Sequence, residues 1–162
     1  MRKNDANESI FSDYNINESN KYLIYDVVET IRSFFRAYFA DAIKIDTSIQ
    51  SPSYIFLKGR ALAYFFKEAI KLNKGENILH IYITDTDNVL NIVIGTKNGM
   101  EINKEHENNL YEIARIGDFG MEIAEGKIII CHKLEKIDSI TVRSMDSRCP
   151  LYDDFKEVFF GL

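Results

Sequence analysis

The sequence predicts an α+β domain, a two-layer α/β sandwich with a mixed, mostly antiparallel sheet and helices on one face. Segments with apolar residues at intervals of three and four, typical of helices, alternate with segments in which every second residue is apolar, typical of half-buried strands. Two pairs of strand segments are joined by links too short to hold a helix, which makes the sheet largely antiparallel. These hairpins disfavour the doubly wound dinucleotide-binding plan.

The first half of the chain contains the clearest helix and the clearest single strand. From Tyr22 to Ala40 the apolar residues form one broad stripe at helical spacing. Residues 42–50 then alternate, with isoleucine or threonine at every second position. Ser51-Pro52-Ser53 breaks this strand, and a second short apolar run follows at 54–57. A second amphipathic helix is expected after Lys58-Gly59.

The second half begins with a β-hairpin. The runs "ILHIYIT" (78–84) and "VLNIVIG" (89–95) flank the polar link 85–88, which favours an antiparallel pair. A third helix is expected next, interrupted by Gly117 and Gly120, and a last pair of strands follows it. The expected helices are 22–40, 60–72 and 108–124, and the expected strands are 42–50, 54–57, 78–84, 89–95, 127–135 and 139–145.

Composition limits the classes of function. The chain has 162 residues, 46% of them hydrophobic, and a formal net charge of −5, which disfavours nucleic acid as a partner because phosphate backbones attract a concentrated basic surface. No segment approaches the roughly 18 apolar residues that cross a bilayer, and no signal peptide is visible, so we expect no membrane association and a cytoplasmic location. Cys131 and Cys149 are too few for a disulfide framework.

The expected organisation has three parts. Residues 1–18 are polar and without sustained periodicity, as in a flexible N-terminal segment. Residues 19–145 form the domain, and residues 146–162 form a strongly apolar C-terminal tail. At about 25 cal/mol per Å² such a tail does not stay in water, so it either folds back on the core or meets a partner, as in a homodimer.

Several stretches resemble the ATP-binding domain of sensor histidine kinases, within the GHKL or Bergerat-fold ATPase family. "YDVVETIRSFFRAYFADAIKIDTSIQ" (25–50) is similar to the helix and strand that open such domains, and "ALAYFFKEAIKLN" (61–73) to the helix that holds the Asn box. "IVIGTKNGMEI" (92–102) is similar to the first glycine box, and "EGKIIICHKLEKIDSITVRSM" (125–145) to the closing glycine turn and strands. The resemblance implies the histidine-kinase ATPase-like sandwich.

The departures from the family pattern fall on its polar ligands. The resemblance implies that the family's magnesium-binding asparagine corresponds to Glu68 in this sequence. It also implies that the family's acidic residue, one turn earlier, corresponds to Tyr64. It implies that the aspartate that accepts a hydrogen bond from the adenine amino group corresponds to Lys97, and that the second glycine of the first glycine box corresponds to Glu101. Of that box, only Gly99 is retained cleanly. A lysine carries donors and no acceptor, and a side chain at Glu101 keeps the backbone from a close approach.

Plain interpretations stand beside these. "TKNGM" (96–100) is either an exposed Asn98-Gly99 turn, a relic glycine box or a working nucleotide loop. Glu68 is either on the exposed face of an amphipathic helix, which we favour, or a metal ligand. "IGDFGMEI" (116–123) keeps Gly117 and Gly120 of a second glycine box, but too little chain follows for that box's long helix, so the phosphate lid is shortened or lost.

We therefore expect a non-catalytic regulatory or adaptor protein of two-component or phosphorelay-type signalling that binds a protein partner. No catalytic set is visible, and neighbouring Cys131 and His132 point to opposite faces of a strand, so no metal site is expected. No cofactor is expected either. The relic nucleotide site comprises Glu68, Lys97, Asn98, Gly99, Glu101, Gly117 and Gly120. The alternative is a kinase or ATPase that binds ATP with Mg in a non-standard pocket.

Overall fold

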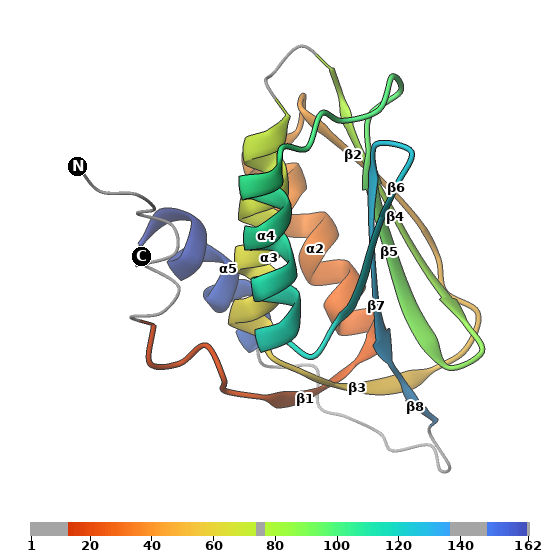
Figure 1. Ribbon diagram of the computed structural model, residues 1–162. Coiled ribbons are helices and arrows are strands. Elements are labelled where there is room, and N and C mark those ends of the chain that lie inside the picture. The colour runs from red at the N-terminus through yellow and green to blue at the C-terminus, as the bar shows by residue number, and fades with distance from the viewer. Residues whose placement is uncertain (1–12, 74–76, 137–148, 162) are drawn as a thin grey trace.

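The computed structural model describes residues 13–73, 77–136 and 149–161, in which helices cover one face of a five-stranded sheet (Figure 1). The elements are β1 (Asn20–Leu23), α2 (Ile24–Phe39), β2 (Ile43–Ser48), β3 (Ser53–Leu57), α3 (Gly59–Leu72), β4 (Leu79–Thr86), β5 (Val89–Gly95), α4 (Lys104–Ile116), β6 (Gly120–Ala124), β7 (Lys127–Lys133), β8 (Glu135–Lys136) and α5 (Pro150–Phe160). Within these ranges, no helix is both long enough and apolar enough to span a bilayer.

The main sheet is mixed and mostly antiparallel, as predicted. Its strand order is β2-β4-β5-β7-β6, with only β2 and β4 parallel. Along β4, Leu79, Ile81 and Ile83 are buried towards the helices, while Tyr82 is 47% exposed on the outer face. This alternation confirms the predicted hairpin and fixes which residues lie on the outer face. A separate small sheet joins β1, β3 and β8.

The helix α3 lies in the middle of the helix layer, between α4 and α2, with α5 on the side away from the sheet (Figure 1). Ten of its 14 residues are buried, against seven of 16 in α2. The buried set on α3 includes polar Glu68 and Tyr64, because other helices and the N-terminal segment cover faces that would otherwise meet water.

The predicted third helix, 108–124, is wrong at both ends. The helix α4 starts at Lys104 and ends at Ile116, with Gly117 as its C-cap and Asp118 in the left-handed region at φ 60°. Residues 120–124 form β6 instead, because Glu125 and Gly126, both at positive φ, make a tight turn that pairs β6 with β7.

The last predicted strands are partly outside the described residues. The expected strand 127–135 is divided, since β7 belongs to the main sheet and β8 pairs with β3 in the small sheet. The expected strand 139–145 lies outside the described residues.

The C-terminal tail folds back on the helix layer as α5. Its apolar face buries Leu151, Phe155 and Val158, and the rings of Phe155 and Phe34 lie 5.3 Å apart in an edge-on arrangement. The sequence left two alternatives for this tail, folding back on the core or meeting a partner, and in the structure it folds back on the core.

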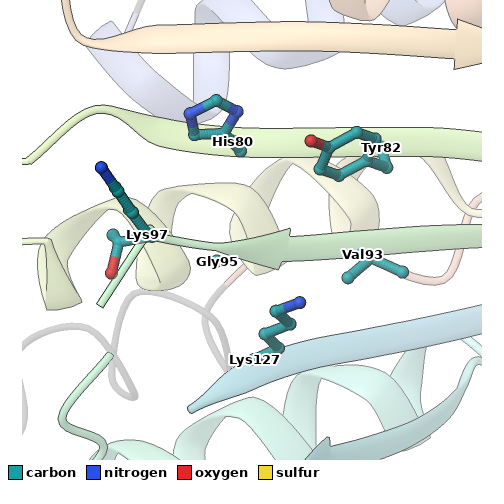
Figure 2. A pocket seen from close by; sticks show the side chains of 7 residues that line it. His80, Tyr82, Val93, Gly95, Lys97 and Lys127 are labelled. Carbon is teal, nitrogen blue, oxygen red and sulfur yellow. The ribbon is translucent and has the colours of Figure 1, made fainter. Parts of the chain in front are cut away.

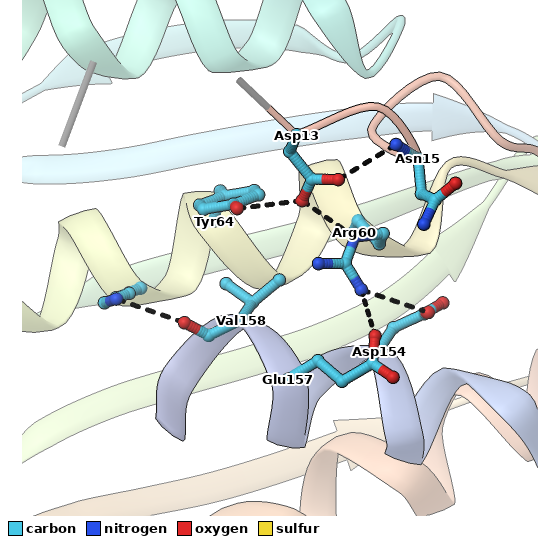
Figure 3. A network of polar contacts seen from close by, with 8 residues as sticks. Asp13, Asn15, Arg60, Tyr64, Asp154, Glu157 and Val158 are labelled. Carbon is cyan, nitrogen blue, oxygen red and sulfur yellow. Dashed lines mark hydrogen bonds and ion pairs between the residues drawn. The ribbon is translucent and has the colours of Figure 1, made fainter. Parts of the chain in front are cut away.

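A polar network ties α5 and the N-terminal segment to α3 (Figure 3). The Arg60 guanidinium donates from Nε to Asp13 at 2.8 Å and also pairs with Glu157 of α5, while the Tyr64 hydroxyl donates to the same Asp13 carboxylate at 2.8 Å. Burial raises the pKa of Asp13, but hydrogen bonds from Tyr64 and Arg60 outweigh it and lower the pKa overall. Residues 13–18 thus form turns anchored to α3, with Ile16 buried.

Candidate functional site

The centre of the expected nucleotide site is a buried carboxylate. Glu68, on α3, is only 3% exposed, so the prediction that it lies on an exposed helix face is wrong. The reason is α4, which packs over this side of α3 and supplies hydrogen-bonding partners. His106 Nδ1 lies 3.0 Å from Glu68 Oε1, and Asn109 Nδ2 donates to the same oxygen at 3.4 Å. Lys71 Nζ lies 3.8 Å from Oε2.

These partners are held in place by the start of α4. The Asn103 side chain accepts a hydrogen bond from the His106 backbone N–H at 2.8 Å, which makes Asn103 the N-cap and places His106 in the first turn. The same first turn carries Glu105 and Glu107, whose charges suit the positive end of the helix dipole. The helix start is therefore already capped and negatively charged, which is the opposite of a phosphate-binding helix start.

The turn that resembles the first glycine box is closed by its own hydrogen bonds. The Gly99 N–H donates to Thr96 O at 3.1 Å, and Thr96 Oγ1 donates back to Gly99 O at 2.9 Å. Gly99 has φ +81°, a conformation that favours glycine, whereas Asn98 is not at positive φ. Met100 N–H donates to Gly126 O at 2.9 Å, so this turn rests on the β6–β7 turn.

Lys97 does not face Glu68. It follows β5 on the outer side of the sheet, where it lines a hollow together with His80, and Figure 2 shows its side chain extending towards that histidine. Thr96, the residue before it, is buried and is the first residue of the turn that the Gly99 N–H closes. The adenine-reading position of the resemblance is thus occupied by a cation that lies on the face of the sheet opposite the helices.

Glu101 lies on the same side as Glu68. It lines a hollow of about 300 Å³ beside the start of α4, together with Lys71, Ile102 and His106. The structure therefore brings Glu101 into the same hollow as His106, which contacts buried Glu68, and Lys71 is the neighbouring cation.

Gly117 and Gly120 lie at the far end of α4. A Cβ on Gly117 would approach Ala61 in the first turn of α3 at 3.0 Å, and Lys58 Nζ donates to Ile116 O beside it. The Gly99 turn rests on Gly126, whereas Gly120 is at the opposite end of the five-residue strand β6, about 17 Å away along that strand. The structure does not bring the two glycine segments together.

Two residues that complete the Glu68 cluster, His106 and Asn109, were missed by the sequence reasoning. His106 lies outside the expected helix 108–124, and the available signal was Asn103, a helix N-cap residue that starts the helix earlier and places His106 and Asn109, three residues apart, on one face. Among residues 13–73, 77–136 and 149–161, no three histidine, cysteine, aspartate or glutamate side chains are grouped so as to hold a metal ion.

Comparison with known proteins gives likenesses of structure only. No protein-family model matches the sequence, and no curated protein matches it. The nucleotide-free catalytic domain of histidine kinase ThkA is similar at TM-score 0.48 and 13% identity, covering 74% of this chain and 96% of that one. The histidine kinase AdeS of Acinetobacter baumannii gives 0.44 and 15%, covering 74% and 68%. The cytoplasmic segment of histidine kinase QseC gives 0.46 and 7%, covering 82% and 90%. All three are histidine kinase structures, and likenesses at TM-scores below 0.5 and 7–15% identity say nothing of what this chain does.

Proposed function

We propose that this chain is a non-catalytic regulator or adaptor in phosphorelay-type signalling, which uses a histidine-kinase-ATPase-like fold to bind another protein and needs no cofactor. One observation carries the proposal. The carboxylate at the position of the family's metal-binding asparagine is buried and bound to side chains of its own chain.

The contacts of Glu68 leave little for a metal ion. A hard cation needs several oxygen ligands in an open arrangement. Here Oε1 is shared by His106 and Asn109, and Oε2 is turned towards the Lys71 ammonium group. Recruiting Glu68 to magnesium would leave buried Asn109 without this partner, which costs about 1–3 kcal/mol, and would also release the partly exposed His106 ring.

The two ends of a nucleotide would also meet the wrong charges. At the base end, Lys97 offers three donors and no acceptor to an adenine amino group, and it lies on the other face of the sheet. At the phosphate end, Glu101 and the acidic first turn of α4 would repel a polyphosphate. Both effects favour a fold that no longer selects ATP.

The surface proposed for the partner is the hollow beside the start of α4. It combines Leu72 and Ile102 with the charged side chains of Lys71 and Glu101, so that a partner could insert an apolar side chain and pair with either charge at the rim. His106 at its wall links the hollow directly to buried Glu68.

Isothermal titration with magnesium-ATP tests the absence of nucleotide chemistry. We expect no saturable heat from the wild-type chain or from Glu68→Gln, which keeps the shape of the side chain. A matched control is Glu112→Gln, at a partly exposed glutamate of α4 that pairs with Arg115. Micromolar binding that disappears in Glu68→Gln and persists in Glu112→Gln would overturn the proposal in favour of a nucleotide-binding kinase or ATPase.

A second titration tests protein binding. The chain is titrated with a receiver domain and with a histidine-phosphotransfer domain, and we expect one of them to bind. Lys71→Glu should weaken that binding about tenfold or more by reversing one charge in the hollow, whereas Lys104→Glu, outside the hollow, should not. Binding that is equally strong in both variants would exclude this surface.

A further inference from the structure

We propose that the outer face of the main sheet carries a second site, which binds a small organic anion, a phosphate or carboxylate group on a flat apolar body. The site is a hollow of about 330 Å³, within the usual size range of small-ligand pockets. Its lining residues are His80, Tyr82, Val93, Gly95, Thr96, Lys97 and Lys127. Because it lies on the face opposite the helices and Glu68, it is independent of the function proposed above.

The hollow follows from the register of three strands. His80 of β4 pairs with Gly95 of β5, and Tyr82 pairs with Val93, so that these residues share the outer face. Gly95 has no side chain, which leaves a depression between its neighbours. The aliphatic stem of Lys127 lies against this depression, since a Cβ on Gly95 would approach Lys127 Cγ at 2.9 Å. A glycine in a strand often marks such a close approach.

Positive charge is concentrated around this depression in a chain whose net charge is −5. Lys97 and Lys127 reach it from two sides, and Figure 2 shows Lys97 extending towards His80 and Lys127 towards Val93. Neither lysine has an ion-pair partner in the described part of the chain, and none of the seven lining residues is acidic. Two such cations and an imidazole attract an anion, and a bound anion would relieve the repulsion between them.

His80 lines the hollow, and its ring carries one nitrogen that no described residue satisfies. Its Nδ1 atom is buried and has no hydrogen-bond partner among the described residues, although most buried polar atoms are paired. The ring is held beside that of Tyr82, with centroids 6.2 Å apart and planes 16° from parallel. An oxyanion placed between the lysines would lie next to this imidazole.

The rest of the lining explains why the ligand should have a flat apolar body. Tyr82 is 47% exposed and Val93 is partly exposed, so a ring and an aliphatic side chain form the surface next to the cationic end. Inorganic phosphate would use only the charged end, whereas an aryl phosphate or aryl carboxylate would cover the apolar surface as well.

The test is an amide-shift titration of the ¹⁵N-labelled chain with phenyl phosphate, inorganic phosphate and neutral benzyl alcohol. We expect saturable shifts at His80, Gly95 and Lys97 with phenyl phosphate, with a Kd on the order of 1 mM. Inorganic phosphate should bind more weakly, and benzyl alcohol should give no saturable shift.

Variants separate the proposed site from general charge effects. The double change Lys97→Met with Lys127→Met should weaken phenyl phosphate about tenfold or more, while Lys133→Met, on the same strand about 20 Å away, should leave it unchanged. Gly95→Ala adds a methyl group to the floor and should weaken binding with all charges kept. Thermal unfolding of each variant confirms that it is folded. Amide shifts that do not saturate would overturn the proposal. So would a loss of phenyl phosphate affinity in Lys133→Met as large as the loss in the double variant.

Discussion

Replacing Phe155 by alanine should show that α5 is part of the domain core. Phe155 is fully buried, and its ring lies 5.3 Å from that of Phe34 and 5.9 Å from that of Phe66, in two different helices. Truncating such a ring costs about 3–5 kcal/mol, and because α5 is the outermost helix and can shift inwards, we expect about 3 kcal/mol. For a domain of this size that lowers Tm by roughly 6–12 °C.

The assay is urea unfolding followed by far-UV circular dichroism, since the chain has no tryptophan. The matched control is Phe160→Ala, the same change on the same helix at a side chain that is 42% exposed, which should cost less than about 1 kcal/mol. Equal losses in the two variants would refute the packing argument. A wild-type dimer in sedimentation that becomes a monomer in Phe155→Ala would assign the ring to a contact between two copies.

Three further predictions concern the free energy of unfolding, measured by urea at 25 °C. Glu68→Ala should lower it by about 1–3 kcal/mol by leaving two partners on α4 unpaired, and Glu68→Gln should lower it less. Burial raises the pKa of Asp154 from 3.8 to about 6, so the protonated form is favoured in the folded state. The contribution of Asp154 to the free energy of unfolding is therefore lost as pH rises from about 4 to 6. In Asp154→Asn, the free energy of unfolding should change less with pH over this range. Gly161→Ala should lower the free energy of unfolding by about 1–2 kcal/mol, because Gly161 is at positive φ. Gly126→Ala should lower it by more, because Gly126 is also at positive φ and its added Cβ would lie 2.8 Å from Met100 N.

The parts of the fold that the sequence predicts well are those in which one face of an element is buried. The stripe of α2 faces the core along its whole length, so its spacing of three and four was unambiguous and its bounds were off by no more than two residues. The β4–β5 hairpin is equally clear, because inward residues of β4 are buried and outward ones are partly or fully exposed in alternation. Burial on one face imposes the period that sequence analysis detects.

The error at the third helix has the converse cause. The strand β6 is at the edge of the sheet, and each of its residues is at least partly exposed, so no apolar alternation marks it. What makes it a strand is the two-residue turn at Glu125 and Gly126, which folds it onto β7. The expected helix 108–124 ran up to this turn, because a glycine after helical residues is typical of a helix end as well as of a hairpin turn.

The burial of Glu68 is a property of the assembly of helices rather than of α3 alone. A single amphipathic helix has one buried face, and by that rule a glutamate between two lysines belongs to the solvent face. The helix α3 is covered on further sides, by α4 at Glu68 and by α5 and the N-terminal segment at Arg60. A buried carboxylate needs partners, so its burial required polar residues on the element that covers it. His106 and Asn109 meet that requirement. Because they are three residues apart on α4, both reach Glu68 on α3, so the residues of both helices are needed to bury this carboxylate.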